Sequence, residues 1–409
     1  MSGLRNYIVV TAAYWGFTLT DGALRMLVLL HFHALGYTPF ELAMLFVLYE
    51  FMGVVTNLTG GWIAARFGVK STLTGGLALQ VAALLALSAL GSDWSKMTAV
   101  VYVLAVQGAS GVAKDLSKMS AKSAIKLIVP DNSHAQLFKW VAMLTGSKNA
   151  LKGAGFFLGG FLLATLGFGP ALWAMAGCLG VALAATMVLL PGDLGRAKAK
   201  TKFTQLFSKS RAINRLSAAR VFLFGARDVW FVVGLPVFLY DVLGWRFAEI
   251  GAFLALWVIG YGFVQGLAPS MTMCSADGRS SEVRGAQIWV LGLTAVTLVL
   301  AAAMQSSVAP TTLLIVGLGV FGFVFAVNSV LHSYLILAFS NSSDVSLNVG
   351  FYYMANAAGR LGGTLLSGLA YQWGGLVGCL VTAAALLAAA AVFTLMLGPV
   401  VHERTATAE

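Results

Sequence analysis

Charged residues are scarce in this sequence, and so is cysteine. Only 10% of the 409 residues are Asp, Glu, Lys or Arg, whereas 59% are hydrophobic and the mean hydropathy is +0.86. This composition excludes a soluble globular domain. The three cysteines (Cys178, Cys274 and Cys379) are far apart and form no CxxC or Cys/His cluster. We therefore expect neither a disulfide framework nor a metal site, and we interpret the cysteines as helix-packing residues.

Long apolar runs fill most of the chain. At about 20 residues per membrane span, the hydropathy predicts an all-α polytopic membrane protein with twelve transmembrane helices. Their approximate ranges are 6–33, 40–65, 72–91, 97–120, 136–165, 170–190, 214–241, 247–272, 285–305, 310–338, 346–370 and 374–398. The first run is too long for a cleavable signal and contains Asp21 and Arg25, so we expect it to be retained as a spanning helix.

The formal net charge of +11 raises the question of nucleic-acid binding. The position of the basic residues favours an orienting role in a membrane instead. On a twelve-helix count most of them fall on one side of the membrane: Arg5, Arg66, Lys70, the stretches 114–139 and 196–215, Arg279, Arg284 and Arg404. The opposite loops hold chiefly Lys96 and Arg246. The positive-inside rule then predicts that both termini are cytoplasmic, and we expect no nucleic-acid partner.

The second half of the sequence repeats the first. A shift of 208 residues aligns Leu35-Gly36-Tyr37 with Leu243-Gly244-Trp245, Tyr49 with Trp257, and Lys152 with Arg360, and it brings Asp21 within one residue of Asp228. Such a repeat predicts two pseudo-symmetric six-helix halves. We expect these halves at residues 1–190 and 214–409, joined by a basic cytoplasmic linker at residues 191–213.

Charged side chains inside the spans are the main functional signal. Each one costs at least about 2.5 kcal/mol near the bilayer centre unless it faces protein or water. Tyr14, Thr18, Asp21 and Arg25 share one face of the first span, which either an Asp21–Arg25 ion pair or a cavity wall explains. The deep cations outnumber the deep acids by three, because Arg25, Lys148, Lys152, Arg227 and Arg360 stand against Asp21 and Asp228.

Other polar residues recur at helical spacing. Trp257, Tyr261 and Gln265 form one such face, and Tyr352, Asn356 and Arg360 form another. Packing explains each aromatic or amide side chain singly, but their combination with the charged faces favours a cavity wall. A lysine stripe with a spacing of four residues would attract anions, so we assign Lys114, Lys118, Lys122 and Arg220 to a cytoplasmic entrance. Arg220 could instead snorkel to the headgroups. Asp21, Asp228 and Glu50 are candidates for ion pairing or for coupling to a proton.

A cavity with surplus positive charge suits a small organic polyanion. Arginine grips carboxylate or phosphate through two parallel hydrogen bonds, and lysine adds a point charge. A neutral sugar or a lipophilic cation would leave these charges unpaired. The sequence contains no Ser/His/Asp, metal-ligand or paired-carboxylate constellation, so we expect neither an enzyme nor a cofactor. The predicted substrate-binding residues are Arg25, Lys148, Lys152, Arg227, Arg360, Tyr352, Asn356, Trp257 and Tyr261.

Two short motifs resemble those of the major facilitator superfamily. Gly61, Arg66, Gly68 and Lys70 match its Gly-x-x-x-Asp-Arg-x-Gly-Arg-Lys loop, with Ala65 and Val69 at the two positions that differ. The run from Gly155 to Gly160 resembles the antiporter motif of its fifth helix, with Phe156 in place of proline. Close helix packing explains the same small residues equally well. The resemblance implies a transporter that works by alternating access.

Three longer stretches resemble a narrower group. Residues 13–33, 114–153 and 206–240 look like the bacterial organoarsenical efflux permeases of the ArsJ type. This resemblance implies export of 1-arseno-3-phosphoglycerate, which forms when glyceraldehyde-3-phosphate dehydrogenase uses arsenate in place of phosphate, and hence arsenate resistance. The alternative is a general exchanger or exporter of phosphorylated three-carbon metabolites. We expect a monomer, and the residues are compatible with both uniport and proton antiport.

Overall fold

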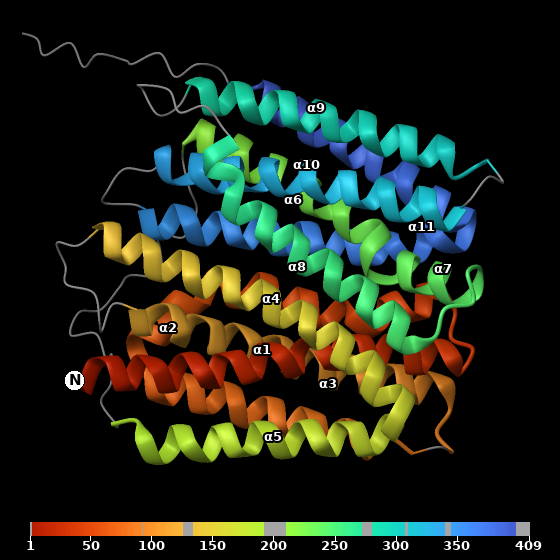
Figure 1. Ribbon diagram of the computed structural model, residues 1–409. Helices are drawn as coiled ribbons and strands as arrows, with labels where there is room; N and C mark the ends of the chain where they lie inside the picture. The colour runs from red at the N-terminus through yellow and green to blue at the C-terminus, as the bar shows by residue number, and fades with distance from the viewer. Residues whose placement is uncertain are drawn as a thin grey trace, which may run out of the picture.

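The computed structural model describes residues 2–91, 93–125, 134–191, 210–271, 280–306, 310–339 and 345–397. Every element in these ranges is helical, and the helices lie side by side along one long axis (Figure 1). Their bounds are α1 (Ser2–Ala34), α2 (Pro39–Ser88), α3 (Lys96–Ile125), α4 (His134–Leu166), α5 (Phe168–Leu189), α6 (Arg211–Val229), η2 (Trp230–Gly234), α7 (Leu235–Asp241), α8 (Phe247–Met271), α9 (Ser280–Ala303), α10 (Pro310–Ala338) and α11 (Val345–Leu395).

The number of membrane spans agrees with the prediction. Ten helical segments of the described chain are long and apolar enough to cross a membrane, and α2 supplies two of them on either side of Gly68 (φ 81°). A backbone with positive φ suits glycine and strains other residues, so helical geometry breaks there. The 46-residue segment Gly350–Leu395 breaks in the same way at Gly375 (φ 58°) and supplies two spans. These segments then amount to eleven spans, and α1, whose 33 residues are long enough but which is not among the ten, would be the twelfth.

Hydrogen bonds place two parts of α11 beside α6, one within its first third and one at its end. Arg215, near the start of α6, donates to the Met396 carbonyl (2.7 Å), and Arg220 one turn further on donates to Asn356 (3.2 Å). The chain of α11 therefore runs away from this end of the bundle and returns to it.

One span contains a π-helical turn just before a proline. α6, η2 and α7 form a single span, Arg211–Asp241, whose middle turn is π-helical. Pro236 follows this turn, and a proline inside a helix removes one donor and displaces the carbonyl four residues earlier. The amides of Val233 and Gly234 instead donate to Ser367 Oγ on α11 (3.2 and 3.1 Å). The amides of the wide turn thus find a partner on the neighbouring helix.

The helices fall into two groups. α1 to α5 lie together, and α6 to α11 lie together beside them (Figure 1). This is the two-half architecture that the internal repeat predicts. The half boundaries at residues 190 and 214 stay a prediction, because most of the linker, residues 192–209, lies outside the described residues.

Glycines let the two groups approach closely at the end of the bundle away from the N-terminus. Gly160 on α4 packs against the Phe247 backbone at the start of α8, and Gly368 on α11 packs against Pro39 at the start of α2. These two contacts are related by the 208-residue repeat. His33 and Asp241, again 208 residues apart, join the same end through Nε2 and Oδ1 (2.8 Å). The small residues of the Gly155–Gly160 run therefore have a packing role here.

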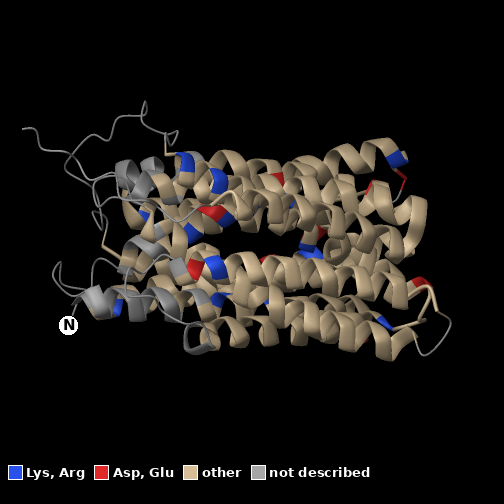
Figure 2. Cartoon of the chain, turned by 90° about the horizontal axis from the view of Figure 1, so that it is seen from above, with Lys and Arg blue, Asp and Glu red and all other residues tan. Residues whose placement is uncertain are grey.

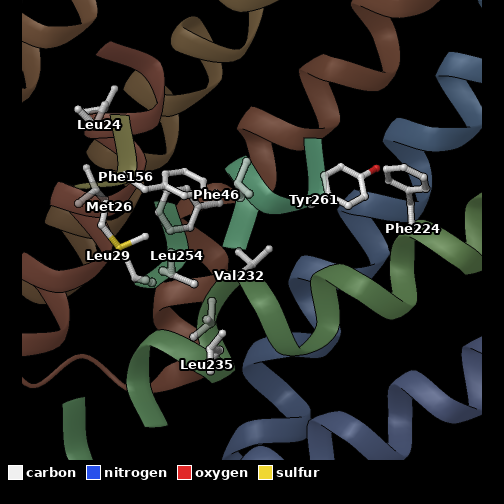
Figure 3. Close-up of a cluster of buried hydrophobic side chains, with 14 of the residues drawn as sticks. Leu24, Met26, Leu29, Phe46, Phe156, Phe224, Val232, Leu235, Leu254 and Tyr261 are labelled. Carbon is white, nitrogen blue, oxygen red and sulfur yellow. The ribbon is translucent and has the colours of Figure 1, made fainter. Parts of the chain in front are cut away.

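Apolar side chains fill the interior next to this closed end. Figure 3 shows Phe46 from α2 and Phe156 from α4 in one cluster of buried apolar side chains that also includes Val232 and Leu254. Phe46 and Phe156 are each 1% exposed. This cluster separates the closed end from the polar centre of the bundle.

Candidate functional site

A cavity of about 270 Å³ lies between the two groups of helices. Its walls come from α1, α2, α3, α4, α6, η2, α8, α10 and α11, so both groups contribute. The lining residues of α1 run from Tyr14 to Asp21, and those of α11 run from Tyr353 to Arg360. They lie in the middle of the bundle and toward the end that carries the N-terminus. A much smaller space of about 20 Å³ lies at the deep end, next to Arg25 and Met26.

Charged side chains dominate the walls, and positive charge is in excess. Figure 2 shows basic and acidic positions within the bundle as well as at its ends. Among the described residues that line the two spaces, eight are basic: Arg25, Lys114, Lys118, Lys148, Lys152, Arg220, Arg227 and Arg360. Four are acidic: Asp21, Glu50, Asp115 and Asp228.

Five of these side chains form a continuous chain of ion pairs at the deep end. Glu50 forms ion pairs with Arg25 (2.9 Å) and with Arg360 (2.6 Å), and it accepts a hydrogen bond from Arg360. Asp228 accepts from Arg360 (3.2 Å) and from Arg227 (2.5 Å). Both carboxylates are 1% exposed. Three arginines therefore share two carboxylates, and the Arg360–Glu50 pair joins α11 to α2 across the two groups of helices.

Asp21 is not part of this chain. Tyr49 donates its hydroxyl to both oxygens of Asp21 (2.7 and 3.0 Å), while Arg25 turns to Glu50. The local Asp21–Arg25 pair, which the sequence left open, is not formed. The cavity-wall interpretation holds, since Asp21 lines the cavity.

Three cations face the cavity without a carboxylate partner in the described part of the chain. The amine of Lys152 lies 5.6 Å from the centre of the Phe156 ring, and that of Lys114 lies 4.0 Å from the centre of the Tyr49 ring. Arg220 is held by neutral groups, because it donates to Asn356 Oδ1 (3.2 Å) and Ser329 Oγ (3.1 Å). Arg220 is only 5% exposed and thus does not snorkel to the headgroups.

The remaining lysines differ in their surroundings. Lys118 pairs with Asp115 and donates to Asn57 Oδ1 (2.7 Å), and Asp115 also accepts from Thr56. Lys148 lines the cavity one helical turn from Lys152. The side chain of Lys122 lies outside the described residues.

The predicted aromatic and amide residues divide into two sets. Trp257, Tyr261 and Asn356 line the cavity. Trp257 also donates to the Leu318 carbonyl (2.8 Å), so it serves packing as well. Tyr352, by contrast, is 1% exposed and lies 5.0 Å from the Arg220 guanidinium, behind the wall. Its neighbour Tyr353 lines the cavity instead.

Several wall residues were not predicted as site residues. They are Asn57, Asp115, Asn149, Ser329 and Ser333. Asp115 lies inside the lysine stripe and Asn149 directly follows Lys148, so proximity to a deep cation was the available signal. Ser329 and Ser333 carry no such signal, since hydroxyls are common in spanning helices.

A charged cavity between two groups of spanning helices, closed at one end by close packing, defines a membrane transporter. The sequence profile described as Major Facilitator Superfamily matches residues 7–273, and the chain belongs to this family. Membership makes the chain a transport protein rather than an enzyme. The crystal structure of a mutant of the nucleoside transporter NupG is similar, with a TM-score of 0.71 and 13% identity, covering 97% of this chain and 99% of that one. At this identity the likeness shows the fold alone. No curated protein sequence matches the chain.

Proposed function

We propose that this transporter exports a small organic polyanion, 1-arseno-3-phosphoglycerate, across a bacterial inner membrane and so confers arsenate resistance. The observation that carries the proposal is the cavity, whose described walls hold eight basic and four acidic side chains. A cation without a counter-ion is costly in a low-dielectric interior. A substrate that brings its own negative charge removes that cost.

The arrangement of the cations fits a substrate with an anionic group at each end. Lys148, Lys152 and Arg25 would hold one end, and Arg227 with Arg360 would hold the other. The three arginines share two carboxylates, so they retain one positive charge and free donors for an oxyanion. The choice of the arsenate ester among small polyanions rests on the resemblance to organoarsenical efflux permeases. This resemblance covers residues 13–33, 114–153 and 206–240.

The membrane potential supports the proposed direction. The positive-inside rule predicts that the N-terminal end of the bundle is cytoplasmic, and the cavity lies toward that end. A potential that is negative inside drives an outgoing anion by about 2.3 kcal/mol per charge for each 100 mV. A substrate with about three charges would gain roughly 7 kcal/mol, so uniport is feasible.

Everted membrane vesicles provide the test. Glyceraldehyde-3-phosphate dehydrogenase with its substrate, NAD and arsenate would generate the ester outside the vesicles, and arsenate and 3-phosphoglycerate would be measured inside. We expect both products to accumulate together, and more slowly after an ionophore collapses the potential. Accumulation of 3-phosphoglycerate supplied without arsenate would favour the alternative, a general exchanger or exporter of phosphorylated three-carbon metabolites.

Substitutions in the cavity test whether the transported ester binds there. We expect Lys152→Ala and Arg360→Ala each to abolish arsenate resistance while the protein still reaches the membrane. Lys96→Ala is the matched control, because Lys96 is exposed and pairs with Glu41 (2.8 Å) outside the cavity. Full resistance in both site variants would remove the cavity as the substrate site.

A further inference from the structure

The 208-residue repeat makes the two sides of the cavity comparable residue by residue. Gly160 contacts Phe247 and Gly251, and Gly368 contacts the equivalent Pro39 and Ala43. The α4–α8 contact in one place and the α11–α2 contact in the other are therefore built on the same register. Nearer the cavity the agreement continues to within one residue, since Gly262 faces Asn149 and Gly53 faces Ala357.

The symmetry breaks where the charges lie. Arg360 on α11 and Lys152 on α4 occupy equivalent positions. Arg360 pairs with Glu50 on the neighbouring α2 (2.6 Å). The residue equivalent to Glu50 on α8, the neighbour of α4, is Val258, which also lines the cavity. Lys152 and Val258 line the same cavity, and the repeat puts an aliphatic side chain at the position where Arg360 finds a carboxylate.

The second acid breaks the symmetry as well. Arg360 also pairs with Asp228 (3.2 Å), whose nearest equivalent on α1 is Asp21. Asp21 is held by the Tyr49 hydroxyl (2.7 Å) instead of forming an ion pair with Lys152. The residue equivalent to Tyr49 is Trp257, whose Nε1 donates to the Leu318 carbonyl. Thus the protein supplies two carboxylates to Arg360 and none within ion-pair distance to Lys152 in the described part of the chain.

We propose that an oxyanion of the substrate binds beside Lys152, against Val258, at the pseudo-symmetric counterpart of the Glu50 carboxylate. The ligand class is a carboxylate, phosphate or arsenate group. Lys148, one turn away on the same wall, and Phe156, whose ring lies 5.6 Å from the Lys152 amine, border this subsite. Glu50 fills the equivalent place beside Arg360, so one of two related anion positions is occupied by the protein's own side chain. The inference rests on the proposed polyanion transport but specifies where one end is held.

Placing an acid at position 258 tests the subsite. In Val258→Glu a carboxylate would pair with Lys152 and exclude the substrate anion. A charge-assisted hydrogen bond of this kind corresponds to about a tenfold to hundredfold change in binding. We expect the rate of ester transport into everted vesicles to fall by that factor. Val258→Gln, which is equal in size but carries no charge, separates the effect of charge from that of bulk, and it should lose less transport than Val258→Glu.

A second readout does not depend on the identity of the transported substrate. Modification of Lys152 by an amine-directed reagent, quantified by peptide mass spectrometry, should slow when 3-phosphoglycerate or inorganic phosphate is added. In Val258→Glu the modification should already be slow without any anion. The double variant Glu50→Val with Val258→Glu exchanges the two positions. Its carboxylate lies beside Lys152, so an added anion should bind beside Arg360 instead.

The transport and modification results together decide whether the subsite exists. Normal transport by Val258→Glu, or equal loss in Val258→Gln, overturns the subsite even if the ester is exported. Slow Lys152 modification in Val258→Glu together with anion protection in the natural protein supports the subsite even if the vesicles transport a different anion. Lys152 modification that no anion slows, and that Val258→Glu leaves unchanged, overturns it.

Discussion

Lys152 and Arg360 occupy equivalent places in the two halves, yet their removal should change stability in opposite directions. Lys152 lines the cavity without an ion pair in the described chain, whereas Arg360 bridges Glu50 (2.6 Å) and Asp228 (3.2 Å). Methionine keeps much of the length and the apolar stem of both side chains. Lys152→Met removes an unbalanced charge, and Arg360→Met removes the link between two buried acids.

The magnitudes follow from the two environments. Removing one partner of a buried ion pair costs about 3–5 kcal/mol. Glu50 and Asp228 would each keep one arginine, Arg25 and Arg227, so we expect Arg360→Met to cost about 3 kcal/mol, at the lower end of that range. Lys152→Met removes a cation that has no counter-ion in the described chain. We expect it to stabilise the protein by about 0.5–2 kcal/mol, the usual gain when a functional residue is replaced by one that favours stability.

Thermal unfolding in detergent measures both effects. The ten tryptophans provide an intrinsic fluorescence signal. We expect the apparent Tm to rise in Lys152→Met and to fall in Arg360→Met, while transport is lost in both. If Lys152→Met lowered the Tm as much as Arg360→Met, Lys152 would have a counter-ion, and the reasoning about surplus charge would be refuted.

Two further changes test the closed end and the coupling. In Gly368→Ala the new Cβ would lie 2.6 Å from the Pro39 carbonyl oxygen, so α2 and α11 must separate, at a cost of about 1–3 kcal/mol. Transport in vesicles should slow, whereas Gly180→Ala, which meets no atom within 4 Å, should transport normally; equal rates would exclude a role for this contact. Asp21 is held by the neutral Tyr49 hydroxyl, while Glu50 and Asp228 are held by arginines. We therefore expect Asp21→Asn to remove any response of transport to a pH gradient at constant potential, and an unchanged response would exclude Asp21 as a proton carrier.

Sequence spacing predicted the cavity wall well where the signal was local. Arg227 and Arg360 were placed on the wall because a charge inside an apolar run is costly unless it faces protein or water, and Asn356 because it shares a helical face with Arg360. Tyr352 marks the limit of such spacing. It shares the i, i+4, i+8 face of Asn356 and Arg360, but only its neighbour Tyr353 reaches the cavity. A helical face spans a wide angle, and the neighbouring helices decide which part of it is covered.

The sequence by itself determined the membrane class, the twelve spans, the internal repeat and the presence of deep charges, because hydropathy and residue spacing act along the chain. Only the tertiary structure decided which charges meet. Glu50 lies 310 positions before Arg360, yet the two side chains form an ion pair, whereas Asp21 and Arg25, one turn apart, do not. Ion pairing depends on distances of a few ångströms between different helices, and these distances are set by glycine contacts such as Gly368 on Pro39.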